Sequence, residues 1–413
     1  MNIICDNIFT HIYIMFLSNE SYKSIDNIVS NESYKSIDNI VSNESYKSID
    51  NIVSNEEDEE EDGSNELKDK KSELIYTLDK FNQLLGILNE YTDLKNLWMV
   101  NKNLWNSNEH KSLCYLRLKK YKSKEYWKSK KFRTYIHSKV LNPNKQISLN
   151  LSNCEEITDV SMLGKVHTLN LNECKRLTDV SMLGKVHTIY LSACNGVTDV
   201  STLRNVHTLD LSACNGVTDV SSLGNVHTLF LSWCRNIRDV SYLGKVHILH
   251  LSDCKGITDV SALRNVYELN LSGCDKITDV SALGNVHELD LSKCYGVTDV
   301  SALGNVHELD LSNCTGITDV SSLRNVHTLD LSNCYRITDV SSLGNIHSLN
   351  LSYCNKITDV SMLGNVHTLD LSYCTGIIDV SSLGNVYYLN LSFCDRVKDV
   401  SMLRNFRRDI YFF

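Results

Sequence analysis

The fold is determined by a 20-residue stretch, VHTLDLSNCYRITDVSSLGN, at residues 326–345. The same frame runs without a slip from Gln146 to Asn405, which gives thirteen copies, and cysteine occupies one fixed position in all of them. An unbroken period of this length is typical of a solenoid, in which each copy forms one coil. The period therefore takes precedence over any interpretation of single residues.

Within one copy, the apolar residues predict two walls. Polarity alternates along Leu329–Leu331, which predicts a short strand with both leucines in the core. Ile337, Val340 and Leu343 return at intervals of three, which favours a tight helical turn on the opposite wall. One coil exposes its leucines on both sides, so only stacked neighbours can bury them.

Two polar or flexible positions are expected to shape this turn. Asp339 stands directly before Val-Ser-x-Leu, so its carboxylate can accept the free backbone N–H groups that follow. Gly344 is expected to relax the bend that leads back to the next strand. The sequence thus predicts a capped turn on the outer side of each coil.

The copies resemble the cysteine-containing type of leucine-rich repeat, with the pattern L-x-x-L-x-L-x-x-C-x-x-I-T-D, over residues 146–405. The resemblance implies an α/β solenoid, a leucine-rich-repeat horseshoe of 13 short repeats with a parallel inner β-sheet. The coils are at the short end of the known range of roughly 20–29 residues, so a 3₁₀ or short-turn outer wall is expected. A repeat-rich chain of this kind also resembles proteins of large DNA viruses or protists.

Cysteine usage indicates a reducing compartment. Thirteen of the fifteen cysteines form one inward-pointing ladder, and Cys5 and Cys114 lie elsewhere. Buried, reduced thiols that pack as small apolar groups are expected, because neighbouring side chains point the same way. The parallel arrangement also has the wrong geometry for tetrahedral zinc. We therefore expect a cytoplasmic protein, in the host cytoplasm if viral, with the nucleus as the alternative.

The N-terminal region has little capacity to fold by itself. Residues 1–17 are an apolar segment without a preceding Lys or Arg, too short to span a bilayer, so no membrane partner is expected. Residues 18–65 contain three identical copies of SNESYKSIDNIV and an acidic run. This composition is polar, which predicts a low-complexity tether.

Residues 66–110 have a helical pattern that resembles a degenerate F-box. Leu94, Leu97 and Val100 recur at intervals of three and would form one stripe on a helix face. The Leu-Pro pair that usually opens an F-box is absent, and the final aromatic residue, Trp105, lies one position later than in the family pattern. A plain helical cap over the first repeat is the alternative. The resemblance implies binding to the adaptor of cullin-type ubiquitin ligases through Leu84, Leu88, Leu94, Leu97, Val100, Lys102 and Trp105.

Residues 111–145 are predicted to form a basic helical connector that caps the array. Eleven Lys and Arg residues stand against one acidic residue, Glu125, in residues 111–139, and six aromatic residues are interleaved. This mixture suits nucleic-acid binding, with cations for phosphates and rings for bases. We favour a connector whose aromatic side chains pack on the first repeat while its lysines face water. Residues 406–413 are expected to cap the other end.

Deviations from the repeat mark the candidate binding face. Clustered aromatic and apolar residues on a concave wall resemble binding anchors, and drift after duplication is the alternative. Three groups on this face stand out. The first, expected to gather into an apolar patch, comprises Tyr190, Phe230, Trp233, Ile248 and His250. The second, an acidic stretch, comprises Glu268, Glu288, Glu308, Asp290, Asp310 and Asp330. The third, again aromatic, comprises Tyr353, Tyr373, Tyr388 and Phe393.

Ten copies carry a histidine at the strand entrance, for example His167 and His187. A metal ladder and a structural stack are the two interpretations, and the stack is favoured. The repeated Asp159 and its equivalents could bind Ca²⁺, but capping explains them without an ion. No metal or other cofactor is expected.

The sequence contains no enzyme constellation, because its Ser, His and Asp residues recur with the unit. We expect a protein-binding substrate receptor of a cullin-type ubiquitin ligase, monomeric outside that complex. The F-box-like segment would bind the adaptor, and the concave face would bind the target. The alternative is a plain protein-interaction module with no ligase link. A third, less favoured class is nucleic-acid binding through residues 111–139.

Overall fold

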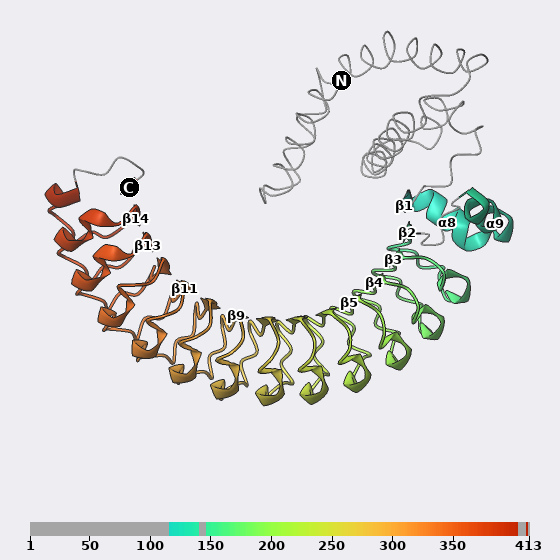
Figure 1. The fold of residues 1–413 in the computed structure, drawn as a ribbon, viewed down its shortest axis with the longest axis horizontal. Helices are drawn as coiled ribbons and strands as arrows, with labels where there is room; N and C mark the ends of the chain where they lie inside the picture. The colour runs from blue at the N-terminus through green and yellow to red at the C-terminus, as the bar shows by residue number, and fades with distance from the viewer. Residues whose placement is uncertain (1–114, 140–145, 404–409, 412–413) are drawn as a thin grey trace, which may run out of the picture. The chain divides into compact units, whose positions relative to one another are not determined.

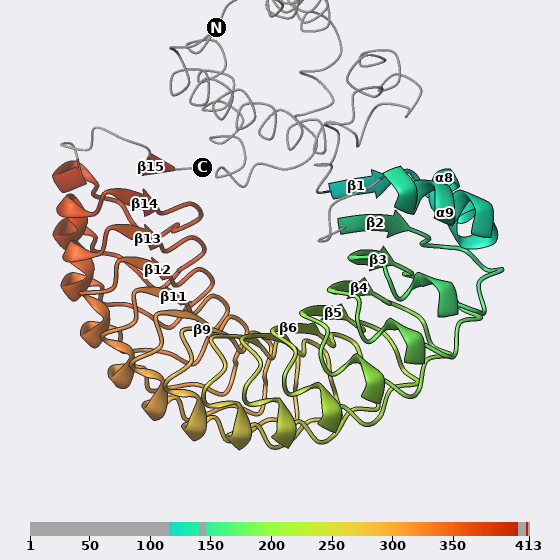
Figure 2. The same ribbon diagram turned by 45° about the vertical axis from the view of Figure 1, so that its right-hand side comes forward.

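The structure is a computed structural model that describes residues 115–139, 146–403 and 410–411. In this part of the chain, strands β1 to β15 form one sheet in chain order, and neighbouring strands are parallel (Figure 2). The coils curve, with the strands on the concave side and the 3₁₀ turns on the convex side (Figure 1). The predicted leucine-rich-repeat horseshoe with a 3₁₀ outer wall is confirmed.

The strands and turns recur every 20 residues through the array. The strands are β1 (Tyr115–Leu118), β2 (Gln146–Asn150), β3 (Thr168–Asn170), β4 (Thr188–Tyr190), β5 (Thr208–Asp210), β6 (Thr228–Phe230), β7 (Ile248–His250), β8 (Glu268–Asn270), β9 (Glu288–Asp290), β10 (Glu308–Asp310), β11 (Thr328–Asp330), β12 (Ser348–Asn350), β13 (Thr368–Asp370), β14 (Tyr388–Asn390) and β15 (Ile410–Tyr411). The 3₁₀ turns run from η1 (Ser161–Leu163) to η13 (Ser401–Leu403), and all have three residues except η11 (Ser361–Asn365) and η12 (Ser381–Asn385).

Each coil is a chain of tight turns between the two walls. In the coil of β11, the N–H of Cys334 donates to the carbonyl of Leu331, and the N–H of Ile337 donates to that of Cys334, both at 3.1 Å. The N–H of Leu343 donates to the carbonyl of Val340 at 3.0 Å. All five side chains are buried. Apolar residues at intervals of three therefore meet in one core, which stacking continues from coil to coil.

The predicted aspartate cap is present on the outer wall. Oδ1 of Asp339 accepts the backbone N–H of Ser341 at 2.9 Å. This backbone bond, and then the Ser341 hydroxyl, hold the pKa of Asp339 below its ordinary value. The same bond recurs from Asp159 to Asp399. Capping accounts for these aspartates without an ion.

The expected role of Gly344 was wrong. Its φ is −64°, which any residue adopts, so no unusual backbone conformation requires glycine there. A Cβ atom would instead collide with the carbonyl oxygen of Met362 in the next coil. Close approach of successive coils is therefore the reason for this glycine.

A left-handed residue precedes every cysteine of the ladder, which the sequence did not lead us to expect. The values of φ lie between 55° and 70°. Glycine and asparagine adopt this conformation readily, whereas bulky side chains are strained in it. Only four of these thirteen positions hold Asn or Gly, and the others include Trp233, Tyr353, Tyr373 and Phe393.

The first described residues depart from the helical pattern expected there, because β1 pairs with β2 and extends the sheet. Helices α8 (Lys120–Lys128) and α9 (Lys130–Lys139) follow. Tyr126 is buried, and Nε1 of Trp127 donates to the carbonyl of Asp159 at 2.8 Å. Nζ of Lys128 lies 2.8 Å from Oε2 of Glu156. These helices therefore use aromatic side chains to contact the first coils. Among the described helices, none has the length and hydrophobicity needed to cross a bilayer.

Candidate functional site

The concave face is built from the first and third residue of each strand. In β11, Leu329 is buried, whereas Thr328 and Asp330 are partly exposed. Alternation along a strand sends the outer two side chains to the same face of the sheet. Parallel register then aligns equivalent residues of successive coils in columns, such as Asp310 beside Asp330.

The third strand residue usually has a structural role. In ten coils it is Asp or Asn, and its Oδ1 accepts the backbone N–H of the residue two positions later at 2.7–3.1 Å. That residue is a serine in nine coils and Asn172 in one. Asp330 and Ser332 are one example, at 2.8 Å. This is an Asx turn, which satisfies an N–H that no neighbouring strand reaches. The sequence interpretation treated these residues only as solvent-facing.

Three coils replace this Asp or Asn by a ring: Tyr190, Phe230 and His250. In the Tyr190 coil, Asn172 of the preceding coil accepts the Ser192 N–H instead, at 2.9 Å. In the other two coils no side chain of the described residues accepts the serine N–H. A hydrogen bond of this kind contributes about 0.5–1.5 kcal/mol, so both substitutions are costly for the fold.

Phe230 and His250 lie together on paired strands. Their ring centroids are 4.9 Å apart and the rings are tilted by 60°. Ile248 is on the same strand as His250 and is partly exposed. With Trp233 these residues form what we call the aromatic patch. Tyr190 is separated from it by strand β5, whose Asp210 lies between Tyr190 and Phe230 in the register.

Trp233 is the most exposed member of the aromatic patch. Its relative exposure is 49%, and its φ is 65°. The guanidinium carbon of Arg235 lies 6.0 Å from the ring centroid. The equivalent residues of the adjacent coils are Ala213 and Asp253, so neither neighbouring coil offers the indole a ring at this position.

An acidic strip adjoins the aromatic patch. We use this name for Glu268, Glu288, Glu308, Asp290, Asp310 and Asp330, which lie on strands β8 to β11. The glutamates are partners in consecutive strand pairs, and so are the aspartates. Nε2 of His250 lies 2.9 Å from Oε1 of Glu268, which joins patch and strip.

Asp310 occupies the middle of the acidic strip. Burial raises its pKa, hydrogen bonds from Ser312 oppose that shift, and the charges of Asp290 and Asp330 raise it further. Asp290 and Asp330 each accept an amide N–H from a neighbouring asparagine, at 2.8 Å. The strip therefore concentrates negative charge on a partly buried surface.

The third predicted group divides into two. Tyr353, Tyr373 and Phe393 form a stack at the left-handed positions, with ring centroids 4.3 and 4.4 Å apart. Tyr388 lies at the strand entrance instead, edge-on to Tyr387 at 4.6 Å. The stack compensates its own strain by ring contacts, and the structure does not bring Tyr388 into it.

The histidines form a column at the strand entrance. Neighbouring rings run from His167 to Tyr387, with Tyr267 filling one gap and centroids 4.5–4.8 Å apart. All pairs are stacked except His227 and His247, whose rings are tilted by 45°. Burial, and then the charge of neighbouring imidazoles, lowers the pKa of His167 and of His227. The described residues contain no cluster of three or more His, Cys, Asp or Glu suited to a metal. The favoured structural stack agrees with this arrangement.

The thirteen ladder cysteines are free and buried. Each thiol from Cys174 to Cys394 donates to the carbonyl of a leucine in the preceding coil, as Cys334 does to Leu311 at 3.2 Å. Burial raises the pKa of Cys194 to about 12 and that of Cys234 to about 11. These sulfurs are therefore packing groups and not nucleophiles.

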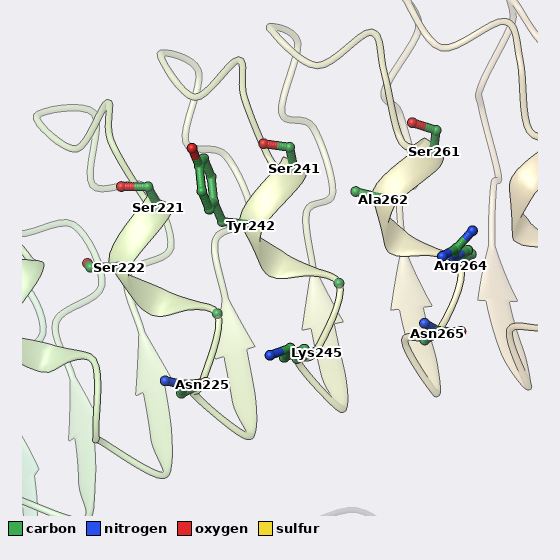
Figure 3. A pocket seen from close by; sticks show the side chains of 12 residues that line it. Ser221, Ser222, Asn225, Ser241, Tyr242, Lys245, Ser261, Ala262, Arg264 and Asn265 are labelled. Atoms are coloured by element: carbon green, nitrogen blue, oxygen red, sulfur yellow. The ribbon is translucent and has the colours of Figure 1, made fainter.

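An open hollow lies on the outer wall between turns η4, η5 and η6 (Figure 3). It is lined by equivalent residues of successive coils, including Tyr242, Lys245 and Arg264. None of its lining residues is buried. It is the exposed groove between coils, and it carries no enclosed set of polar groups.

The predicted adaptor-binding residues, from Leu84 to Trp105, lie outside the described residues, as do Cys5 and Cys114. The sequence found the aromatic patch through deviations from the repeat. It missed the Asx turns, which could have been recognised because Asp or Asn recurs two residues before a serine. It also missed the left-handed positions, for which Asn153, Gly273 and Asn313 were the available signal.

A match to a family model agrees with the repeat pattern. A family model described as leucine-rich repeats (2 copies) matches residues 324–365. An internalin, InlF, from Listeria monocytogenes str. 4b F2365 is 24% identical, with a TM-score of 0.47, over 62% of this chain and 84% of that chain. The functional domain of InlJ from Listeria monocytogenes, described as including a cysteine ladder, is 21% identical, with a TM-score of 0.43, over 64% of this chain and 63% of that one.

A third similar structure is the complex of Rad7 and Elc1 in yeast, at 14% identity and a TM-score of 0.35 over 82% of this chain and 87% of that chain. No curated protein sequence has a significant match. All three TM-scores are below 0.5, so no partner or activity of this chain follows from them.

Proposed function

We propose that this leucine-rich-repeat protein is a substrate receptor, which holds a target protein on its concave face and presents it to a cullin-type ubiquitin ligase. A leucine-rich-repeat solenoid is a protein-interaction scaffold, because its curved sheet offers a long surface to a partner. The proposal has two parts, target binding by the described coils and adaptor binding by residues 66–110.

One observation carries the first part. Phe230 and His250 occupy positions where ten other coils have an Asp or Asn that completes a hydrogen bond with the backbone. Their rings lie 4.9 Å apart, and the exposed Trp233 follows Phe230 by three residues in the same coil. Substitutions that cost stability and gather in one exposed patch are better explained by binding than by drift.

The second part rests on the resemblance of residues 66–110 to an F-box. Leu94, Leu97 and Val100 supply the apolar stripe that would contact the adaptor. The alternative is a plain protein-interaction scaffold in which this segment only caps the array. Both functions use the same concave face, so only the adaptor distinguishes them.

Co-purification tests the two parts separately. We expect the tagged full chain to recover the ligase adaptor, identified by mass spectrometry. Leu97→Asp should abolish that recovery, because a buried unpaired carboxylate disrupts an apolar interface. Trp233→Ala should retain the adaptor and lose the target, since truncation of a central aromatic anchor typically costs about 2 kcal/mol or more.

Tyr335→Ala is the matched control, because Tyr335 is 50% exposed but does not belong to the aromatic patch and lies in the coil of β11, five coils after that of Trp233. It should recover both partners. If the wild-type chain recovers no adaptor, the proposed link to a ubiquitin ligase is wrong and the plain protein-interaction scaffold remains. Equal target recovery by the Trp233 and Tyr335 variants would remove the concave face as the binding site.

A further inference from the structure

Two surfaces of different chemistry adjoin on the concave face. Phe230, Ile248 and His250 of the aromatic patch lie on strands β6 and β7, and Trp233 lies in the turn after β6. The acidic strip continues over β8 to β11, and His250 contacts Glu268 where patch and strip meet. Neighbouring strands lie about 4.8 Å apart, so the distance from β6 to β11 is about 24 Å. An extended chain of about seven residues spans that distance.

We infer that this surface binds an extended basic segment of a partner protein. An aromatic or aliphatic side chain of the segment lies on the aromatic patch, and its lysines or arginines follow the acidic strip. The inference rests on the proposed function, because it names the class of target that the concave face holds.

Charge complementarity identifies the occupant. The side chains of Glu268, Glu288 and Glu308 are 34%, 38% and 53% exposed, so a partner can reach their carboxylates. Asp310 lies between Asp290 and Asp330 and is partly desolvated. A cation nearby would reduce the repulsion between these carboxylates and stabilise the charged form of Asp310. The negative charge of the acidic strip repels phosphates, which excludes nucleic acid from this face and favours a basic polypeptide.

Trp233 supplies the anchor. It is 49% exposed in a strained left-handed conformation. Tyr353 and Tyr373 share that conformation, but they stack on each other at 4.3 Å. Trp233 has no such ring partner among the described residues, and the guanidinium carbon of Arg235 lies 6.0 Å from its ring centroid. An indole held this way offers a rigid apolar surface to a partner side chain.

Three fluorescein-labelled synthetic peptides in a Gly/Ser background test the inference against the full-length chain. One has a Trp followed by four Arg, the second replaces the Trp by Ser, and the third keeps the Trp without charge. Fluorescence anisotropy should show the Trp-Arg peptide binding more than about tenfold tighter than either of the others. Its affinity should fall as salt rises from 50 to 300 mM, because salt screens charge complementarity.

Variants of the chain then locate the site. The double variant Glu288→Gln, Glu308→Gln should weaken the Trp-Arg peptide more than about tenfold. The control double variant Glu155→Gln, Glu173→Gln removes the same charge from coils outside the strip and should change affinity less than about twofold. Unchanged unfolding midpoints show that each variant is folded.

The alternative occupant is a second copy of this chain, because the lysines of its helices α8 and α9 would supply the positive charge. Sedimentation velocity without peptide tests it. A salt-sensitive dimer that the Glu288→Gln, Glu308→Gln variant loses would overturn the assignment to a partner protein. A monomer in both forms supports it.

Two further results would overturn the inference: failure of the Trp-Arg peptide to bind, or equal effects of the two double variants. The proposed function survives either result if the uncharged Trp peptide binds and Trp233→Ala abolishes that binding. If no peptide binding depends on Trp233, the concave face loses its support as a target site as well.

Discussion

Nε2 of His250 lies 2.9 Å from Oε1 of Glu268, and this contact links two different surfaces of the concave face. His250 belongs to the aromatic patch and Glu268 begins the acidic strip. His250 also occupies a position where most coils use Asp or Asn to accept a serine N–H. The contact is an ion pair whenever the imidazole is protonated, so it favours a continuous surface from strand β6 to strand β11.

Phe230→Asn should separate binding from stability. The new side chain can accept the Ser232 N–H, as Asn270 accepts that of Ser272 at 3.0 Å. A bond of this kind contributes about 0.5–1.5 kcal/mol, which offsets the lost contact between the Phe230 and His250 rings. We expect the urea midpoint to equal or exceed that of the wild type, while target affinity falls.

Tyr190→Asn is the control for this substitution. The Ser192 N–H already donates to Asn172, so no stability should be gained. Tyr190 also lies outside the aromatic patch, so target affinity should persist. Loss of more than about 1 kcal/mol in Phe230→Asn would show that the ring stabilises the fold, contrary to our account.

The cysteine ladder should react slowly with a thiol reagent in the native state. The sulfurs are buried, and burial raises the pKa of Cys274 and of Cys354 to about 12, so thiolate is scarce at neutral pH. At most two of the fifteen thiols should label rapidly before denaturant is added, because thirteen belong to the ladder. Rapid labelling of most thiols in the folded protein would refute this packing.

The histidine column should destabilise the array in mild acid. The pKa of His227 is lowered from its ordinary value of 6.5 by burial and by His207 and His247. The unfolded chain therefore binds protons more readily. The stability from neutral His227 is present above about pH 6.5 and is lost as pH falls below it. The urea midpoint should fall between pH 7.5 and 5.5.

The double variant His207→Gln, His227→Gln should reduce that fall. Thr208 and Thr228 are the polar groups that contact these rings, at 3.2 Å, and they do not titrate in this range. Asp310 has the opposite effect on the pH dependence of stability, because its pKa is raised in the folded chain. Its protonation in acid removes the repulsion from Asp290 and Asp330. An identical pH dependence in wild type and variant would mean that the column does not carry the effect.

The sequence predicted the fold because the 20-residue period specifies stacking, and the intervals of Ile337, Val340 and Leu343 specify a 3₁₀ wall. It could not show which deviations meet. Tyr190 and Phe230 look equivalent in sequence, yet Asp210 separates them in the sheet. The hydrogen bond from the Ser332 N–H to Asp330 and its equivalents were also missed, because the alternation along the strand was interpreted only as exposure to solvent.

One measurement tests the central claim most directly: photo-crosslinking from a benzoylphenylalanine placed at Trp233, compared with the same group at Tyr335. Both positions are exposed, at 49% and 50%, but only Trp233 belongs to the aromatic patch. We predict a covalent product with the target from position 233 and none from position 335. The same product from both positions, or a product from position 335 alone, would contradict a target site at the aromatic patch.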